Sequence, residues 1–341
     1  MKVKAYIGSQ IAHTSQIFTG LAMLRKAGKI ALFFSKDPLL GKSAAIQRCE
    51  VDGRLLVFDL ADGFVNDPVH YASCDLYFKR MLAPDTPDPL GKLRPYGLNY
   101  PVHTAGDTSI RRAWISGDKR RLMEAILRSS VLLSRLFNIN LSHSTSQVRH
   151  FEGRPAVNAH HPRVIYFTRL WDPSKVKDER LKAQREVMNA MRRALVRALR
   201  DELKDQFIGG IYRTEFSAAF APAETAPDNR ALHKAAYLKA LRASDIGIAD
   251  YGLEMSVGFK MAEYVAMSKA IVSSPVNTLL PGSFEQGKNY LAYDTVEECL
   301  NHCVGLIRRP ELILEMQRHN ADYYRQYLRP DQLVWNCLTT A

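Results

Sequence analysis

Short apolar runs alternate with segments of helical period through the first part of the chain. Apolar residues that recur every three or four positions indicate helices, and short continuous apolar runs indicate buried strands. Asp67 followed by Pro68 marks a helix start, since the pair supplies an N-cap and a favourable first helical residue. The strands predicted here span residues 3–7, 30–34, 55–59 and 76–78. Their alternation with helices predicts a parallel, doubly wound α/β sheet.

A similar alternation continues in the second half. Residues 142–162 carry clustered Ser, His, Gly and Pro without periodicity, so we place an interdomain linker there. A chain of 341 residues is too long for one ordinary hydrophobic core. We expect one domain over residues 1–150 and another over 151–315, with helices of 316–341 packing back toward the first. In the second domain the pattern predicts strands at 164–167, 207–208 and 245–249 and helices at 174–203, 231–241, 295–307 and 310–327.

The segment from residue 258 to residue 275 contains the most informative candidate ligand-binding residues. Gly258 opens a helix, and an apolar strand follows it. Lys260 and Glu263 stand three residues apart, so they project from neighbouring positions near the positive end of this helix. Backbone N–H groups at a helix start and a cation satisfy a diphosphate, while a carboxylate accepts hydrogen bonds from ribose hydroxyls. The segment therefore predicts a nucleotide-sugar site.

The motif Lys-x-x-Glu-Tyr of residues 260–264, followed by Lys-Ala-Ile-Val-Ser, resembles the donor-binding segment of GT-B glycosyltransferases of the group 1, family 4-like kind. The resemblance covers most of residues 205–310. A weaker likeness to bacterial surface-polysaccharide transferases lies in residues 75–80 and 94–100. The resemblance implies two Rossmann-like, doubly wound domains facing a central cleft. It also implies that Lys260 contacts the donor phosphates and Glu263 the ribose.

Two arginines follow the first strands of the second domain. Arg169 lies in the loop after residues 164–167 and could neutralise a leaving diphosphate without a metal. The equivalent loop of the GT-B enzymes that the chain resembles carries a cation that contacts phosphate. The alternative is an ordinary loop arginine that pairs with Asp172. Arg213, after the next strand, is a further candidate for donor binding.

The first domain offers a glycine loop and several titratable residues. Gly8 follows the first strand and either lets the backbone approach a ligand or makes a tight turn. Any of four residues near strand ends could accept the proton of an acceptor hydroxyl: His13, Asp59, Asp62 and His70. We choose Asp62 as the catalytic base, because a carboxylate beyond the strand can reach a cleft, whereas Asp59 is placed to satisfy local backbone.

The glutamate spacing leaves the stereochemical outcome open. Retaining GT-B families often carry two glutamates separated by seven residues, whereas Glu254 and Glu263 are separated by eight. We place Glu254 with Asp62 among the catalytic candidates; it either touches the donor sugar or has a surface role of its own. A Gly-x-Gly-x-x-Gly fingerprint is absent, which argues against a nicotinamide dehydrogenase. The lack of an Asp-x-Asp motif disfavours a metal-dependent GT-A transferase.

The net charge of +12 is concentrated in the first half. Residues 1–160 hold 22 Lys and Arg against 13 Asp and Glu, while the rest hold 25 against 22. A basic half attracts nucleic acid, anionic lipid headgroups or a diphosphate-linked acceptor. A predicted amphipathic helix over residues 118–137 has a cationic face that could dock on an anionic membrane or simply cover the sheet.

Hydropathy and cysteine content bear on the cellular compartment. No stretch approaches the eighteen or so apolar residues that a membrane span needs, and the N-terminus lacks the features of a signal peptide. We expect a cytoplasmic protein, peripheral at the inner face of the plasma membrane. Five cysteines without framework spacing indicate reduced thiols. Cys299, His302 and Cys303 could face a metal, but their segment also fits an amphipathic helix and lacks a fourth ligand, so we predict neither metal nor cofactor.

These observations favour a glycosyltransferase that moves a sugar from a nucleotide sugar to a glycan or lipid-linked acceptor in surface-polysaccharide assembly. One alternative is a non-hydrolysing nucleotide-sugar epimerase, which needs no acceptor. Another is a nucleic-acid-binding protein, suggested by Tyr96, Tyr100 and Trp114 near several arginines but lacking a recognition module, so that no nucleic acid partner is expected. A catalytically idle scaffold is a third alternative.

Overall fold

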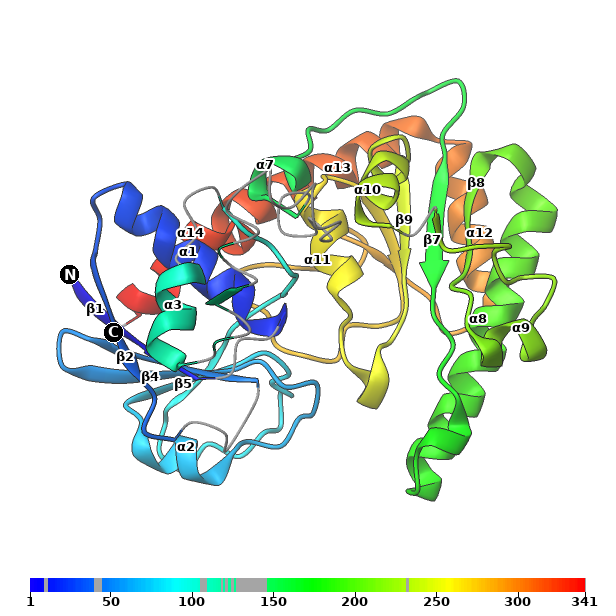
Figure 1. Cartoon of the computed structure of the whole chain (residues 1–341). Coiled ribbons are helices and arrows are strands. Elements are labelled where there is room, and N and C mark those ends of the chain that lie inside the picture. Colours follow the sequence, from blue (N-terminus) through cyan, green and yellow to red (C-terminus); the bar gives the residue numbers. More distant parts are fainter. Residues whose placement is uncertain are drawn as a thin grey trace. The chain divides into compact units, whose positions relative to one another are not determined.

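The computed structural model describes residues 1–8, 12–39, 45–104, 109–117, 119, 122–123, 126, 146–230 and 233–340. These residues form two compact units, each with its own sheet (Figure 1). Unit 1 contains Met1–Phe151, Thr278–Gly282 and Arg325–Ala341, and unit 2 contains Glu152–Asn277 and Ser283–Tyr324. The predicted fold class, two α/β units, is confirmed. The helix predicted over residues 118–137 falls largely outside the described residues.

Unit 1 is built on a six-stranded sheet of order β2-β1-β3-β4-β5-β6. Neighbouring strands are parallel except where β3 pairs with β1 and β4. The strands are β1 (Lys2–Ile7), β2 (Ala31–Lys36), β3 (Ile46–Val51), β4 (Arg54–Asp59), β5 (Leu76–Lys79) and β6 (Leu93–Pro95). The α-helices described in this unit are α1 (Ser15–Lys26), α2 (Pro68–Ser73), α3 (Ser109–Ser116), α7 (Val148–Phe151) and α14 (Pro330–Thr339). The four strands predicted from the sequence correspond to β1, β2, β4 and β5.

Strands β3 and β4 form a hairpin that the hydrophobic pattern did not predict. Asp52 and Gly53 make its two-residue turn, with φ angles of 46° and 92°. A type I′ turn needs positive φ at both positions, and Asp-Gly is one of its favoured pairs. This turn reverses the chain, so β3 is antiparallel to the strands on either side of it. The Asp-Gly pair is the sequence signal that could have identified the hairpin.

Helices α1 and α14 pack together from opposite ends of the chain. Gly20 of α1 permits this contact, because a Cβ there would overlap the carbonyl oxygen of Pro330 and approach Val334 Cγ2 to 2.5 Å. Gln16 Nε2 donates to the carbonyl of Leu328 at 3.2 Å, which satisfies a buried amide. The C-terminal helix therefore completes the cover of the unit 1 sheet.

A charged pair is buried at the carboxyl ends of β4 and β5. Lys79 Nζ donates to Asp59 Oδ2 at 2.7 Å and to the carbonyl of Val65 at 2.9 Å. Tyr77 Oη donates to the same Asp59 oxygen at 2.6 Å. The exposed fraction is 0% for Lys79 and 2% for Asp59. Charges removed from water need a partner and further hydrogen bonds, and this cluster supplies both.

Unit 2 is built on a parallel five-stranded sheet of order β11-β10-β9-β7-β8. The strands are β7 (Val164–Thr168), β8 (Phe207–Ile211), β9 (Ile246–Ala249), β10 (Ala270–Ser273) and β11 (Leu291–Ala292). The α-helices described in this unit are α8 (Glu179–Leu203), α9 (Glu215–Phe220), α10 (Lys234–Arg242), α11 (Phe259–Ala266), α12 (Val296–Ile307) and α13 (Pro310–Tyr323). Helices α8 and α12 cover one face of the sheet, and α10 and α11 cover the other (Figure 1). The strands predicted in this half are confirmed.

Helix α10 spans Lys234–Arg242, where 231–241 was predicted. Two further helices of unit 2 differ in extent from their predictions. Helix α8 begins at Glu179 rather than at residue 174, because Asp178 caps it by accepting the N–H of Leu181 at 3.0 Å. Helix α13 ends at Tyr323, and a π-helical turn over Tyr324–Leu328 follows it. Both differences concern helix ends, where local hydrogen bonds decide and hydrophobic period does not.

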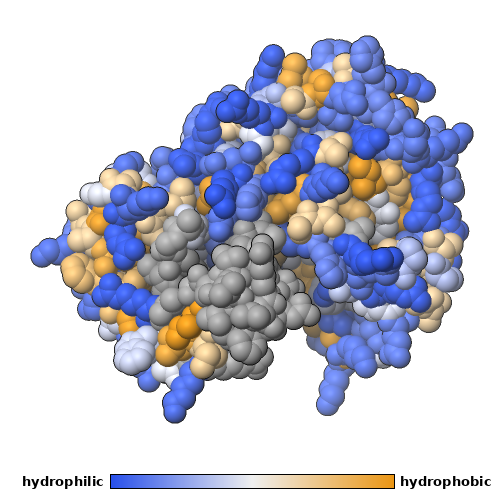
Figure 2. All heavy atoms as spheres, turned by 45° about the horizontal axis from the view of Figure 1, so that its top comes forward, coloured by the Kyte–Doolittle hydropathy of each residue, from blue (hydrophilic) through white to orange (hydrophobic). Residues whose placement is uncertain are grey.

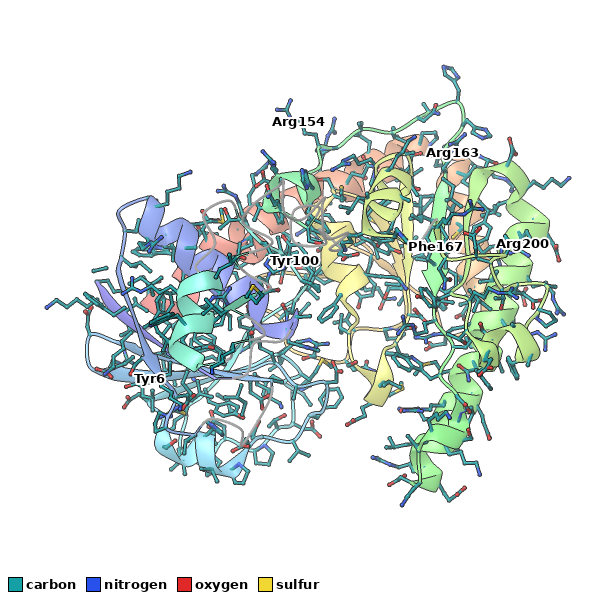
Figure 3. All side chains as sticks on the ribbon, viewed as in Figure 1. Tyr6, Tyr100, Arg154, Arg163, Phe167 and Arg200 are labelled. Atoms are coloured by element: carbon teal, nitrogen blue, oxygen red, sulfur yellow. The ribbon has the colours of Figure 1, made fainter. Side chains whose placement is uncertain are left out.

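Helix α11 lies unusually close to the sheet. A Cβ at Gly247 of β9 would meet ring carbons of Tyr264 at 2.6 to 2.8 Å, so only glycine fits beneath this ring. On the same face, Phe167 of β7 packs edge-on against Tyr237 of α10 with ring centroids 6.3 Å apart (Figure 3). This tight packing fixes α10 and the last turn of α11 relative to the strands.

The surface visible in Figure 2 is mostly hydrophilic, with scattered apolar patches. Such patches are ordinary on folded proteins. Among the helices of the described residues, none has the length and apolar character needed to cross a bilayer.

Replacing Lys79 by Met is expected to leave the Asp59 carboxylate buried without its partner charge. Breaking a buried pair in this way costs about 3–5 kcal/mol of stability. Urea unfolding of the parent and Lys79→Met measures the difference. Lys4→Met is the matched control, because Lys4 pairs with Glu50 on an exposed part of the same sheet and its loss should matter much less. Equal effects of the two substitutions would contradict this expectation.

Candidate functional site

The loops that follow β7, β8, β9 and β10 gather at the carboxyl edge of the unit 2 sheet. Open α/β sheets bind ligands at this edge. A small hollow there is lined by residues after β9 and β10 and by the start of α11, including Asp250, Gly258 and Ser274. The predicted site residues of unit 2 come from these loops and from α11: the donor-binding candidates Arg169, Arg213, Gly258, Lys260 and Glu263, and the catalytic candidate Glu254.

A buried arginine that sequence analysis did not single out organises this edge. Arg192 of α8 donates from Nε to Asp250 Oδ2, from Nη1 to the carbonyl of Arg169 at 2.5 Å, and from Nη2 to the carbonyl of Tyr251 at 2.7 Å. The exposed fraction of the side chain is 6% for Arg192 and 11% for Asp250. One planar guanidinium thus fixes the chain after β7 relative to the chain after β9.

The loop between β9 and α11 holds strained backbone. Glu254 and Met255 have φ angles of 56° and 59°, in the left-handed region that non-glycine residues rarely adopt. Gln184 of α8 accepts the Glu254 N–H at 3.1 Å and supports this conformation. Strain of this kind concentrates at functional sites. The Glu254 carboxylate is exposed at the tip of the loop.

Lys260 is a partly exposed cation in the first turn of α11. Gly258 is the N-cap residue and supplies no side-chain cap, so this helix end is open to an anion. A Cβ at Gly258 would meet only the carbonyl of Asp250, at 3.9 Å. Within the described part of the chain, the Lys260 side chain makes no hydrogen bond or ion pair.

Protein surroundings disfavour the charged form of Lys260. Burial lowers the pKa of Lys260 below its ordinary value of 10.5, against the attraction of the Asp250 carboxylate. Arg192 lowers the pKa further. A cation in this situation is stabilised when an anion binds beside it.

Glu263 lies deeper than Lys260 and is paired with α10. Lys234 Nζ donates to Glu263 Oε1 at 2.5 Å, and Glu263 is 5% exposed. Burial and the Glu263 carboxylate raise the pKa of Tyr237 well above its ordinary value. Lys234 thus engages one carboxylate oxygen of Glu263, and a carboxylate has several acceptor positions that a ligand hydroxyl can use.

Arg169 is an exposed arginine held between two aromatic rings. Its guanidinium carbon lies 4.5 Å from the ring centroid of Tyr212 and 5.7 Å from that of Trp171. The alternative pairing with Asp172 does not occur, because Asp172 accepts hydrogen bonds from the N–H and hydroxyl of Ser174 instead. Arg169 forms no ion pair with the described residues. Its charge is therefore available to an anion, and the rings restrict its orientation.

Arg213 lies after β8, at the same edge. Asn229 accepts its N–H at 2.8 Å and donates to its carbonyl at 3.0 Å, so the backbone of Arg213 is fixed. Its side chain is exposed. The structure places Arg213 beside Tyr212, which contacts Arg169.

In unit 1, two of the predicted candidates lie together. Asp62 Oδ1 accepts a hydrogen bond from Arg80 Nη1 at 2.7 Å, and His13 Nε2 lies 3.9 Å from the same oxygen. Burial alone would raise the pKa of Asp62, but His13 and Arg80 outweigh it and lower the pKa to about 2. The Asp62 side chain remains 40% exposed.

The other first-domain candidates differ in surroundings. Asp59 belongs to the buried pair with Lys79, and it also accepts the N–H of Ala61 at 3.0 Å, as predicted for a residue satisfying local backbone. His70 is buried and contacts Asp67 Oδ1 through Nδ1 at 2.8 Å. Gly8 has no positive φ, and a Cβ there would make only ordinary contacts with Asp37. Residues 9–11, which follow Gly8, lie outside the described part of the chain.

The described residues contain no cluster of three or more His, Cys, Asp or Glu side chains that could hold a metal ion. Cys299 and Cys303 are buried in α12, and His302 Nε2 lies 2.9 Å from the carbonyl of Ala292. Of the two interpretations of Cys299, His302 and Cys303, these contacts fit the amphipathic helix.

No protein-family model and no curated protein sequence matches the chain. Among solved structures, the chain is similar to HepE of Anabaena in complex with UDP and glucose, with 10% identity, a TM-score of 0.40, and 99% of this chain and 98% of that chain covered. It is similar to the C-terminal domain of a group 1 family glycosyl transferase, LpcC, from Francisella tularensis, with 12% identity, a TM-score of 0.32, and 52% and 95% covered. It is also similar to a putative UDP-N-acetylglucosamine 2-epimerase from Listeria monocytogenes, with 13% identity, a TM-score of 0.37, and 79% and 58% covered. All three TM-scores are low, so the function proposed below rests on the residues of this chain.

Replacing Arg192 by Met is expected to destabilise unit 2 by about 3–5 kcal/mol, because Asp250 would keep a buried charge without its partner. Urea unfolding measures the loss. Arg200→Met is the matched control on the same helix, since Arg200 is exposed and donates to a single carbonyl, that of Ala223. If Arg192→Met unfolds like the control, the guanidinium does not have this organising role.

The stability that Asp62 confers should depend on pH. Its folded pKa of about 2 is below its ordinary value of 3.8, so its contribution is fully present above pH 3.8 and is lost as the pH falls toward 2. The difference in unfolding free energy between the parent and Asp62→Asn should therefore be constant near pH 5 and shrink below pH 3.8. Asp85→Asn, at an exposed site, should show no such change. A difference independent of pH would contradict the ion-pair cluster.

Proposed function

We propose that unit 2 binds a nucleoside diphosphate sugar and that the chain transfers this sugar to an acceptor hydroxyl. The observation that carries the proposal is Lys260, a half-buried cation without a partner among the described residues, placed beside the uncapped start of α11. A phosphate there would satisfy both the helix end and the cation. Arg169 supplies a second cation at the same edge.

The remaining donor residues fit the other parts of a sugar nucleotide. The Glu263 carboxylate, which Lys234 holds at one oxygen, is assigned to a ribose hydroxyl. Arg213 adds positive charge on the side of β8. Glu254, at the exposed tip of its loop, is assigned to the hydroxyls of the donor sugar.

Leaving-group stabilisation is the chemical task of Lys260 and Arg169. As the bond between sugar and phosphate breaks, negative charge develops on the diphosphate. Fixed cations stabilise that charge without reorganising during the reaction. The ring contacts of Arg169 and the position of Lys260 on a packed helix provide the required rigidity.

We assign His13 as the base that takes up the proton of the acceptor hydroxyl. Asp62 is the carboxylate that pairs with His13. A carboxylate with a pKa of about 2 is a weak base near neutral pH. Asp62 is instead suited to stabilise the imidazolium that forms when His13 takes up the proton. This assignment revises the choice of Asp62 as the base made from the sequence. The base remains in the group formed by His13, Asp62 and Arg80.

The acceptor proposed is a glycan or lipid-linked glycan of surface-polysaccharide assembly, reached from the cytoplasm at the inner face of the plasma membrane. The basic character of the first half of the chain supports an anionic acceptor or surface. The chemistry requires neither a cofactor nor a nucleic acid partner.

Calorimetric titration with a panel of nucleoside diphosphates tests the donor site. The parent should bind one nucleotide selectively, and Lys260→Ala, Arg169→Ala and Glu263→Ala should each weaken binding about 10- to 100-fold, the size of a lost charged hydrogen bond. Lys239→Ala and Arg308→Ala are charge-matched controls at exposed positions of unit 2. A folded parent that binds no nucleotide, or variants that bind like the controls, would contradict the proposal.

The proton-transfer assignment is tested separately. His13→Ala should lower release of nucleoside diphosphate from the donor, measured with extracted envelope glycans and lipids, by about 10²- to 10⁴-fold. Nucleotide affinity should be unchanged, because His13 belongs to unit 1 and the nucleotide residues to unit 2. Conversion of the donor to an isomeric sugar nucleotide without an acceptor would instead identify an epimerase.

A further inference from the structure

A second, larger hollow lies on the α8 side of the same sheet edge. Its volume is about 530 Å³. One wall is the N-terminal half of α8, which runs past the carboxyl ends of the strands (Figure 1). The other wall is formed by loops after β9, β10 and β11. We call it the α8 groove; its lining includes Ala183, Val187, Met188, Met191, Met255 and Tyr293.

Several polar side chains that line the groove are engaged with the protein itself, while Arg180 and Asp294 are exposed. Arg192 makes three hydrogen bonds, one of them to Asp250. Gln184 accepts the Glu254 N–H. Tyr293 Oη donates to the carbonyl of Ala249 at 3.3 Å. A polar ligand would find few free partners along these walls, whereas an apolar ligand would lose nothing by contacting them.

The apolar part of the lining is exposed and adaptable. Val187 is 72% exposed and Met255 is 40% exposed. Apolar side chains gathered in an open groove mark a binding surface. Three methionines contribute to the lining, and unbranched methionine side chains repack easily around flexible apolar ligands. The strained loop backbone at Met255 holds one of them in place.

The groove is continuous with the proposed donor site. Asp250, Tyr251 and Ser274 line both the α8 groove and the small hollow at the start of α11. A ligand in the groove would therefore extend away from the position of the donor sugar. Arg180, exposed at the rim and without an ion pair to any described residue, offers a contact for an anionic group.

We infer that the α8 groove binds the hydrocarbon chain of the acceptor, so that the acceptor is a lipid carrying a phosphate group. This inference rests on the proposed transferase function, and it narrows the acceptor from glycans in general to lipid-linked ones. The chain lies against Val187 and the methionines, while Arg180 faces the phosphate.

Decyl phosphate, kept below its micelle concentration, is the probe. In protein labelled with ¹³C at the methionine methyl groups, its addition should shift the signals of Met188, Met191 and Met255 in a saturable way. Val187→Glu places a carboxylate in the groove at an exposed position and should weaken binding at least 10-fold, while Val187→Leu should preserve it. Leu90→Glu, at an exposed apolar position of unit 1, is the control.

The outcomes separate this inference from the donor-site proposal. Unchanged nucleotide affinity in Val187→Glu with loss of decyl phosphate binding supports the groove. Decyl phosphate binding that Val187→Glu leaves intact, or unsaturable shifts spread over all methionines, would overturn the inference while leaving the donor site standing. A dimer of the parent that Val187→Glu dissociates, detected by light scattering, would show that a second copy covers the groove and would also overturn it.

Discussion

The candidate site depends on one buried ion pair. Arg192 reaches from the middle of α8 to Asp250 and to two backbone carbonyls, and so joins the ends of β7 and β9. Burying two charges is favourable only when their geometry satisfies both. That requirement fixes the loop that carries Glu254, the backbone of Arg169 and the approach to α11. The ends of β7 and β9 are held together because the buried Arg192 guanidinium needs all of these hydrogen-bond acceptors.

Ion pairing also explains why one side of the unit 2 sheet edge is positively charged and the other is apolar. Arg192 and Asp250 neutralise each other, and Lys234 neutralises much of Glu263. What remains toward α11 is the positive charge of Lys260 and Arg169, and what remains toward α8 is apolar surface. A single edge can thus receive a charged group on one side and a hydrocarbon on the other. The chemistry of the site is decided by the charges that the fold leaves unpaired.

The sequence predicted most strands and helices of both units, whereas the roles assigned to the site residues remain predictions. Hydrophobic period located most strands, because burial on both faces of a parallel sheet imposes continuous apolar runs. It missed β3, whose alternating residues and Asp-Gly turn carry a different signal. Arg169 was singled out because it follows a strand end, and Lys260 because it stands at a helix start in a motif that resembles a donor-binding segment. Arg192 and Lys234 were not, because their partners lie 58 and 29 positions away and no local pattern encodes such pairs.

The contact between α1 and α14 has a consequence for how the chain folds. Gln16 and Leu328 are 312 positions apart, and unit 2 is made almost entirely of the residues between them. During synthesis from the N-terminus, α1 therefore has no partner helix until all residues of unit 2 have been made. Folding of unit 2 meanwhile shortens the loop that must close. Completion of unit 1 then follows the synthesis of unit 2, and it takes place only in chains that contain α14.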